Sequence, residues 1–206
     1  MSIQTLSNHI KNNTQLLHRR VEKPLAKRLF SPDFNLDQYS EILDAFLVLH
    51  RHFEQQIKKF HRVEALLRNR SKILWLEADL AALRQLGANS VVTPFAELTP
   101  LSSTEEAFGA LYVLEGSTMG GQIISQQLAK HSFIDQKKHL RFFNSYENQV
   151  HLMWQELLSA LNDYGSSREH SFHEVSVGAE IVFRNFELVF SNVWKSQELQ
   201  IDRYAG

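Results

Sequence analysis

The segment Leu111–Gln122 reads Leu-Tyr-Val-Leu-Glu-Gly-Ser-Thr-Met-Gly-Gly-Gln and places three glycines among residues that otherwise favour a helix. Each glycine inside a helix costs about 1 kcal/mol relative to alanine, so Gly116, Gly120 and Gly121 weaken it considerably unless something compensates. Two interpretations are open. The glycines allow close packing of a second helix, or they let the backbone of a kinked helix lie flat against a broad ligand.

Outward from this segment, apolar residues recur every three or four positions nearly everywhere, which is typical of amphipathic helices. Glycine and proline number only 8 and 4, too few for the turns of an all-β fold. Pro24 should kink the first helix, Gly87 should stop the third, and the glycines of Leu111–Gln122 should interrupt the fourth. We expect helices at about 3–30, 36–60, 63–86, 102–130, 146–161 and 171–194.

The predicted helices follow one another with short connections, which indicates one domain. Ser102–Glu106 offers two registers of a capping box, and Ser171 with Glu174 should cap the last helix. Residues 88–101 contain Pro94 and Pro100 and are predicted to form a loop. Because no linker is long enough to separate two units, we predict a single all-α domain over residues 1–206, with six or more long helices.

Composition excludes several classes of protein. The chain has no cysteine, so disulfides, zinc–thiolate sites and thiol nucleophiles are absent, and a reducing compartment is indicated. The net charge of −1 argues against nucleic acid as a partner. No run of about 18 apolar residues is present, and Met1–Thr5 is polar, so we expect neither a membrane span nor a signal peptide. The expected location is the cytoplasm.

His18 differs from most of the ten histidines because it lies on the apolar stripe of the first helix, between Leu17 and Val21. An imidazole facing the interior needs partners for both nitrogens. It is either a core histidine bonded to a backbone carbonyl or a metal ligand, with Glu22 one turn later orienting the ring. Seven histidines sit among polar neighbours and are predicted at the surface or its edge: His50, His52, His61, His131, His139, His170 and His173.

Several well-defined motifs are missing. No Glu is followed three residues later by His, so the di-iron signature is absent. There is also no His-Glu-x-x-His, P-loop or Gly-x-Ser-x-Gly motif. The glycine segment does not follow a strand and is therefore not a dinucleotide-binding fingerprint.

Taken together, the pattern Lys11-x-x-Thr14-x-x-x-His18-x-x-x-Glu22 and the later Gly116–Gln122 segment resemble a haem oxygenase. The sequence Leu114–Thr118 is most similar to that of the bacterial haem oxygenases found alongside bacteriophytochromes. The resemblance spans most of the chain. It implies a single all-α domain that holds haem between a proximal and a distal helix.

The resemblance also implies roles for individual residues. His18 matches the proximal iron ligand, within the Thr14 and Glu22 setting quoted above. Lys11 and Arg184 match residues that pair with haem propionates. Lys11 lies seven residues before His18 and hence about 10 Å along the same face. The distal glycines that let the backbone approach haem and its dioxygen are matched by Gly116, Gly120 and Gly121.

The implied reaction is the cleavage of haem by dioxygen and reducing equivalents to biliverdin, ferrous iron and CO. Haem is both substrate and cofactor. The partners implied are an external electron donor such as a ferredoxin or reductase, and a bacteriophytochrome that accepts the product. Many family members carry Asp after the first distal glycine, whereas this chain has Ser117. A hydroxyl relays protons through water but carries no charge, so this departure bears on proton delivery and on which meso carbon is attacked.

Two other functions remain as alternatives. A non-enzymatic haem carrier would have the same pocket without oxygen activation. Another enzyme of the same helical superfamily, such as a thiamine-salvage hydrolase or a quinone-cofactor oxidase, would not take up haem. The absence of cysteine argues against the thiol-dependent hydrolases.

Overall fold

The computed structural model describes the backbone of residues 5–89 and 97–204, and the side chains as far as Trp194. Within these ranges every regular element is a helix and no strand is present. This confirms the predicted all-α class. Pro94, predicted to lie in a loop, is outside the described residues.

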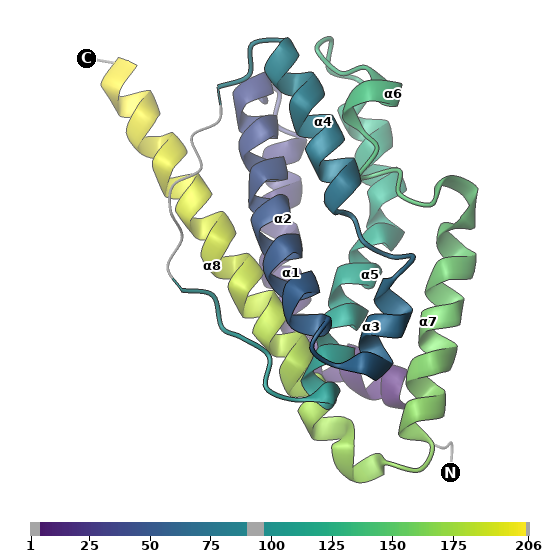
Figure 1. Ribbon diagram of the computed structural model, residues 1–206. Coiled ribbons are helices and arrows are strands. Elements are labelled where there is room, and N and C mark those ends of the chain that lie inside the picture. Colours follow the sequence, from purple (N-terminus) through teal and green to yellow (C-terminus); the bar gives the residue numbers. More distant parts are fainter. Residues whose placement is uncertain (1–4, 90–96, 205–206) are drawn as a thin grey trace.

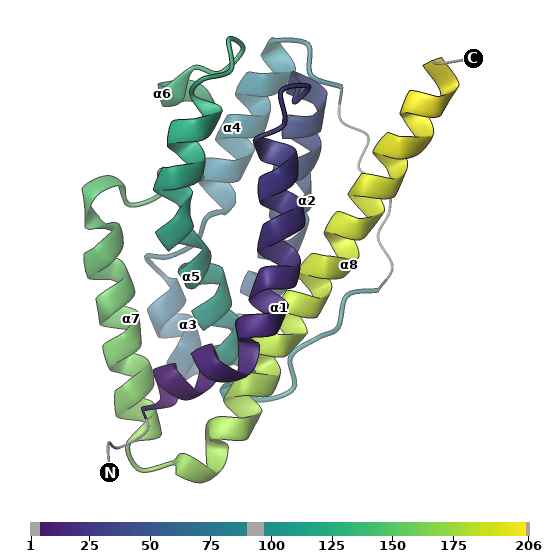
Figure 2. The same ribbon diagram turned by 180° about the vertical axis from the view of Figure 1, so that it is seen from behind.

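The first helix, α1 (Leu6–Leu29), contains Pro24 without ending there. Figure 2 shows that α1 bends in its N-terminal half. The side chains of Asn13 and Thr14 donate hydrogen bonds of 2.8 Å to the carbonyls four residues earlier. Such bonds compete with the helical ladder and bend helices. We attribute this bend to the two polar side chains, because Pro24 lies near the other end of α1.

The predicted helix over 63–86 is two helices. After α2 (Leu36–Ile57) the chain forms α3 (His61–Leu67) and, after a break, α4 (Ile73–Gln85). In the break, Arg70 and Lys72 are buried, with 6% and 1% of their surface exposed. The prediction of one helix was wrong because these two charged side chains turn inward to partners on other elements.

The glycine segment lies within α5 (Thr104–Leu128), which begins after Ser103 as predicted. The Ser103 side chain accepts from the Glu106 N–H, and the Glu106 carboxylate accepts from the Ser102 N–H at 2.6 Å. The helix continues unbroken through all three glycines, so the predicted interruption was wrong. Gly87, with a φ of 93°, follows α4 in the left-handed conformation expected of a helix stop.

The C-terminal half also departs from the predicted bounds. The predicted helix start at Tyr146 was wrong because Tyr146 is left-handed, with a φ of 66°. The last helix continues past Trp194, and Ser171, predicted to cap it, belongs to a short 3-10 helix. The elements here are α6 (Gln136–His139), η1 (Glu147–Gln149), α7 (Val150–Gly165), η2 (Glu169–Ser171) and α8 (Phe172–Tyr204).

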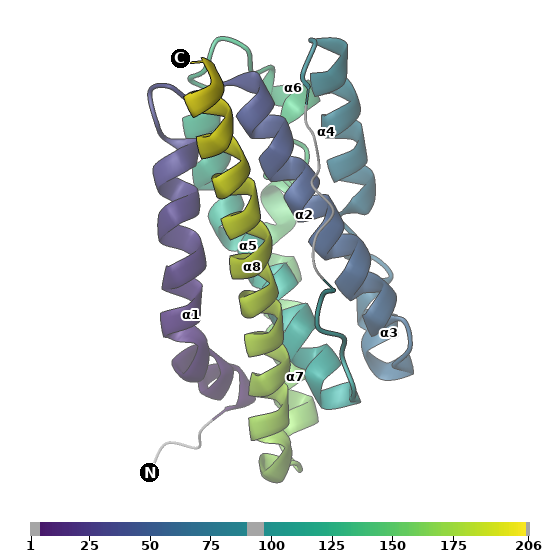
Figure 3. The same ribbon diagram turned by 90° about the vertical axis from the view of Figure 1, so that its left-hand side faces the viewer.

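The helices form a bundle in which α8 runs diagonally across α1 and α5 (Figures 1 and 3). Two glycines allow the close approach of α5 and α8. A Cβ at Gly109 would lie 1.9 Å from the carbonyl oxygen of Val175, and one at Gly178 would lie 2.1 Å from that of Glu106. Backbone therefore meets backbone at this crossing.

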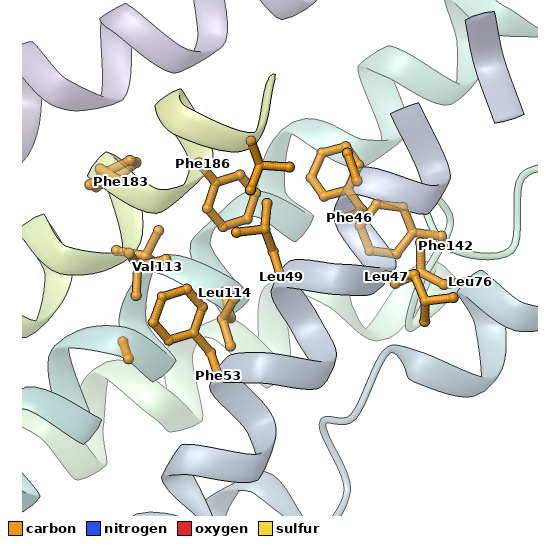
Figure 4. Packing of buried hydrophobic residues seen from close by; sticks show 14 of the residues in the cluster. Phe46, Leu47, Leu49, Phe53, Leu76, Val113, Leu114, Phe142, Phe183 and Phe186 are labelled. Atoms are coloured by element: carbon orange, nitrogen blue, oxygen red, sulfur yellow. The ribbon is translucent and has the colours of Figure 1, made fainter. Parts of the chain in front are cut away.

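Aromatic side chains fill the core between α2, α8 and the loop after α6. The ring of Phe46 lies 4.8 Å from that of Phe142 and 5.2 Å from that of Phe190. Figure 4 shows Phe142 beside Phe46 in the buried cluster, with Phe186 on the other side of Phe46. Because Phe142 comes from the loop after α6, that loop is anchored in the core.

Candidate functional site

His18 lies on the flank of the buried stripe of α1. Leu17 and Val21 are half-buried, and His18 is about 100° further round the helix than Leu17. Its side chain is 56% exposed, so the prediction of an imidazole facing the interior was wrong. The ring lies edge-on to Phe183 of α8, with 5.7 Å between ring centroids. His18 is therefore an exposed imidazole resting on an aromatic ring.

Glu22 holds the His18 ring at one nitrogen. The Nδ1 atom of His18 lies 3.3 Å from a carboxylate oxygen of Glu22, one turn along α1. This is the orienting arrangement that the sequence suggested. With Nδ1 donating to the carboxylate, Nε2 carries a lone pair and is the nitrogen that a metal ion can bind.

The two other predicted residues of α1 have different surroundings. Lys11 is exposed on the same face as His18 and Glu22. Thr14 is buried, and its hydroxyl donates to the carbonyl oxygen of Ile10 at 2.8 Å. Thr14 therefore shapes the helix, whereas Lys11 and His18 are accessible to a ligand.

The three glycines of α5 face different surroundings. A Cβ at Gly120 would meet no atom within 4 Å, and one at Gly116 would make an ordinary contact with Trp154 at 3.5 Å. A Cβ at Gly121 would lie 2.3 Å from the carbonyl oxygen of Phe143. Gly121 therefore serves packing, but against the loop after α6 and not against a second helix, and Gly120 leaves its backbone open. The interpretation that the glycines face a ligand stays a prediction.

Ser117 lies on the open side of α5. It is exposed, as is Gly120, and the side chain of Ile123 on this side is 63% exposed. The Ser117 hydroxyl donates to the carbonyl oxygen of Leu114 at 2.7 Å. Its oxygen lone pairs remain able to accept hydrogen bonds from water. We call Gly116, Ser117, Gly120 and Ile123 the open face of α5.

Arg184 on α8 is not brought together with Lys11 and His18 by any contact between the described residues. Its side chain is 68% exposed and lies 3.5 Å from Glu180 on the same helix. The preceding residue, Phe183, makes the contact with His18 instead. From this position Arg184 reaches a ligand only by extending away from α8.

Sequence reasoning missed a buried ion cluster formed by Arg70, Lys72, Glu115 and Tyr146. The Glu115 carboxylate accepts from Arg70 at 2.9 Å, from the Tyr146 hydroxyl at 3.0 Å, and from Lys72. The Lys72 ammonium also lies 2.6 Å from the Tyr146 oxygen. Burial lowers the pKa of Lys72, and the Glu115 charge opposes that shift. Glu115, the member of the cluster that lies on α5, directly precedes Gly116 in the chain.

His50 and His139 are buried, contrary to the prediction that they lie at the surface. His50 Nδ1 lies 3.1 Å from Glu54, and both side chains are almost fully enclosed. Burial lowers the pKa of His50 and so favours the neutral ring. The signal was present in the sequence, because His50 and Glu54 fall at helical spacing on the apolar stripe that includes Phe46 and Phe53.

The family model described as "Heme oxygenase" matches residues 4–192. The fold is similar to that of the haem oxygenase of Neisseria meningitidis in its NO- and CO-bound crystal structures, with a TM-score of 0.68, 19% identity and 94% of each chain covered. Among curated protein sequences, none matches. None of the described helices is long and apolar enough to cross a membrane.

Proposed function

The chain belongs to the haem oxygenase family, and from that premise we propose that it cleaves haem with dioxygen and external electrons to biliverdin, ferrous iron and CO. In this proposal haem lies between α1, at His18, and the open face of α5. The two helices are in contact with each other. The observation that carries the proposal is the pairing of an exposed, Glu22-oriented imidazole with a helix face on which Gly120 has nothing within 4 Å of a Cβ.

The residues present fit a flat, iron-containing ligand. An imidazole held at Nδ1 presents Nε2 as a single ligand, which suits iron whose other ligands come from a porphyrin. Gly120 lacks the side chain that would keep a ring system away from the α5 backbone. The exposed ammonium of Lys11, on the His18 face, is placed to pair with a propionate. Arg184 is the second proposed propionate partner.

When bound, haem would supply the redox chemistry of dioxygen activation. The protein contributes orientation and protons. His18 fixes one side of the ring, and Glu22 keeps His18 in the required tautomer. Gly116 and Gly120 leave the backbone of α5 without side chains on the other side, whereas Gly121, predicted to share this role, packs against the Phe143 carbonyl. Ser117 accepts a hydrogen bond from water and holds that water at the open face.

Electrons come from outside the chain in this proposal, from a donor such as a ferredoxin or a reductase. A bacteriophytochrome is the proposed acceptor of biliverdin, because the sequence Leu114–Thr118 resembles the haem oxygenases found alongside bacteriophytochromes. The absence of cysteine fits a reducing compartment, and we place the protein in the cytoplasm.

The test is a titration of the purified protein with hemin, followed by a reductant in air with catalase present. We expect a one-to-one Soret band, then its replacement by biliverdin absorbance and release of CO, which ferrous myoglobin captures in exchange for its bound dioxygen. Catalase removes free peroxide, so the product cannot come from peroxide attack on haem. Haem binding without turnover would instead show a carrier. No haem uptake would contradict the proposal and favour another enzyme of the helical superfamily.

A further inference from the structure

The five-residue segment Phe143–Glu147 contacts α5 at both ends of its glycine turn. At the first end, the Tyr146 hydroxyl lies 3.0 Å from both carboxylate oxygens of Glu115. At the other end, the Phe143 carbonyl oxygen lies against Gly121, and Gln122 donates to the Glu147 carbonyl at 2.9 Å. The segment therefore bridges the two turns of helix that contain Gly116 and Gly120.

This contact is on the side of α5 away from the open face. Glu115 and Gln122 are seven residues apart and so lie on one face, about 10 Å apart along the axis. Gly120 points roughly 150° away from both. At Gly116 and Gly120 a ligand on the open face meets backbone without a side chain, so the backbone position there has to be fixed from the opposite side.

The segment is anchored both by the two residues directly before it and by Tyr146 within it. The N–H groups of Arg141 and Phe142 donate to the buried carboxylate of Asp79 at 3.1 and 2.9 Å. Tyr146 packs its ring edge-on against Trp75 and under the Lys72 ammonium, which lies 4.5 Å from the ring centre. Its backbone is left-handed, a conformation that costs free energy for a non-glycine residue and is maintained by such surroundings.

We infer that Phe143–Glu147 is a clamp that fixes the glycine turn of α5 against its open face, with Tyr146 and Gln122 as positioning residues. The inference rests on the proposed function, because it assigns the clamp the task of setting how closely the Gly116–Gly120 backbone approaches haem. Three glycines within six residues leave this turn with weak helix propensity. The clamp supplies the stiffness that the sequence of the turn lacks.

Tyr146→Phe tests the clamp, because it removes the hydroxyl but keeps the ring against Trp75. Tyr164→Phe is the matched control. The Tyr164 hydroxyl donates to Glu105, also on α5, at 2.5 Å, but about 15 Å along the helix from Glu115. Gln122→Leu releases the other end of the clamp. Hydrogen exchange of the haem-free protein measures opening of residues 116–122, and the biliverdin isomer ratio measures haem placement.

We expect Tyr146→Phe and Gln122→Leu to raise amide exchange in residues 116–122 by about tenfold, the factor that loss of one hydrogen bond implies. We also expect both to change the isomer ratio, whereas Tyr164→Phe changes neither readout. Exchange in 116–122 that stays at the wild-type rate, or rises equally in Tyr164→Phe, would overturn the inference. Failure of the wild type to bind haem would refute the proposed function but leave the exchange result standing.

Discussion

Gly120 and Gly121 are adjacent in the chain, yet their surroundings are opposite. A methyl group at Gly120 would meet nothing within 4 Å, whereas one at Gly121 would lie 2.3 Å from the carbonyl oxygen of Phe143. The 100° between successive residues of a helix is enough to separate the two roles. Gly121 is required by packing, and Gly120 is compatible with a ligand. A glycine pattern in a sequence therefore combines structural and functional requirements that only the faces of the helix separate.

The largest expected effect is at Glu115, on the packed side. Glu115→Gln removes the ion-pair partner of the buried Lys72 and leaves the buried Arg70 with Glu156 alone. Removing one member of a buried pair costs about 3–5 kcal/mol. Ser117→Ala on the open face should change stability by less than about 0.5 kcal/mol. Chemical denaturation of both variants measures this contrast. If both variants lost the same free energy of unfolding, the packed side and the open face of α5 would not differ in packing.

The glycines themselves are the second test. Gly121→Ala forces a methyl group against backbone and should lower the free energy of unfolding by about 1–3 kcal/mol or more. Gly120→Ala should keep or raise it, by up to about 1 kcal/mol, because alanine favours helix. Under the proposed function the same variant lowers biliverdin turnover. Thermal melts of the haem-free proteins measure stability, and turnover assays measure activity, for both variants. A destabilised Gly120→Ala variant with normal turnover per folded molecule would contradict the assignment.

The buried carboxyl of Asp79 should make the free energy of unfolding depend on pH. Burial raises the pKa of Asp79 to about 6, against the opposing effect of the Phe142 and Arg141 hydrogen bonds. A folded-state pKa above the unfolded one means that this group stabilises the fold below about pH 4. That contribution is lost as the pH rises through 6. Relative to Asp79→Asn, the wild type should lose roughly 2–3 kcal/mol between pH 4 and 7. Parallel stability curves for the two proteins would rule this out.

The smallest expected effects are at the two propionate partners. Both side chains are exposed, and an ion pair between exposed charges contributes only about 0.2–1 kcal/mol. Lys11→Ala should therefore weaken haem binding or change the biliverdin isomer ratio. Arg184→Ala should do less, because Arg184 is exposed and already paired with Glu180. Haem titration and product analysis of both variants provide the check. Unchanged affinity and product in both would remove the propionate assignment.

Local sequence patterns predicted the features that depend on neighbours in the chain. The start of α5 at Ser103, the stop at Gly87 and the Glu22 contact to His18 all follow from residues within a few positions. The break between α3 and α4 was missed because Arg70 and Lys72 turn towards Glu115, more than forty residues away in the chain. No residue near Arg70 in the sequence indicates that Glu115 is its partner.

The same distinction applies to the candidate site. The glycines were found as an anomaly, but their division into packed and open positions depends on Phe143 and Trp154, which lie on other elements. His50 and His18 are each followed by a glutamate at i+4, with separations of 3.1 and 3.3 Å. Tertiary packing buries the first pair and exposes the second. Spacing alone could not rank them as candidate ligands.

In the proposed function, haem lies against the exposed imidazole of His18. Hemin titration of His18→Ala tests it most directly, with His61→Ala, an exposed histidine on α3, as the control. We predict that His18→Ala loses the wild-type Soret band and recovers it when free imidazole is added, while His61→Ala matches the wild type. An unchanged Soret band in His18→Ala, with no response to imidazole, would contradict the account.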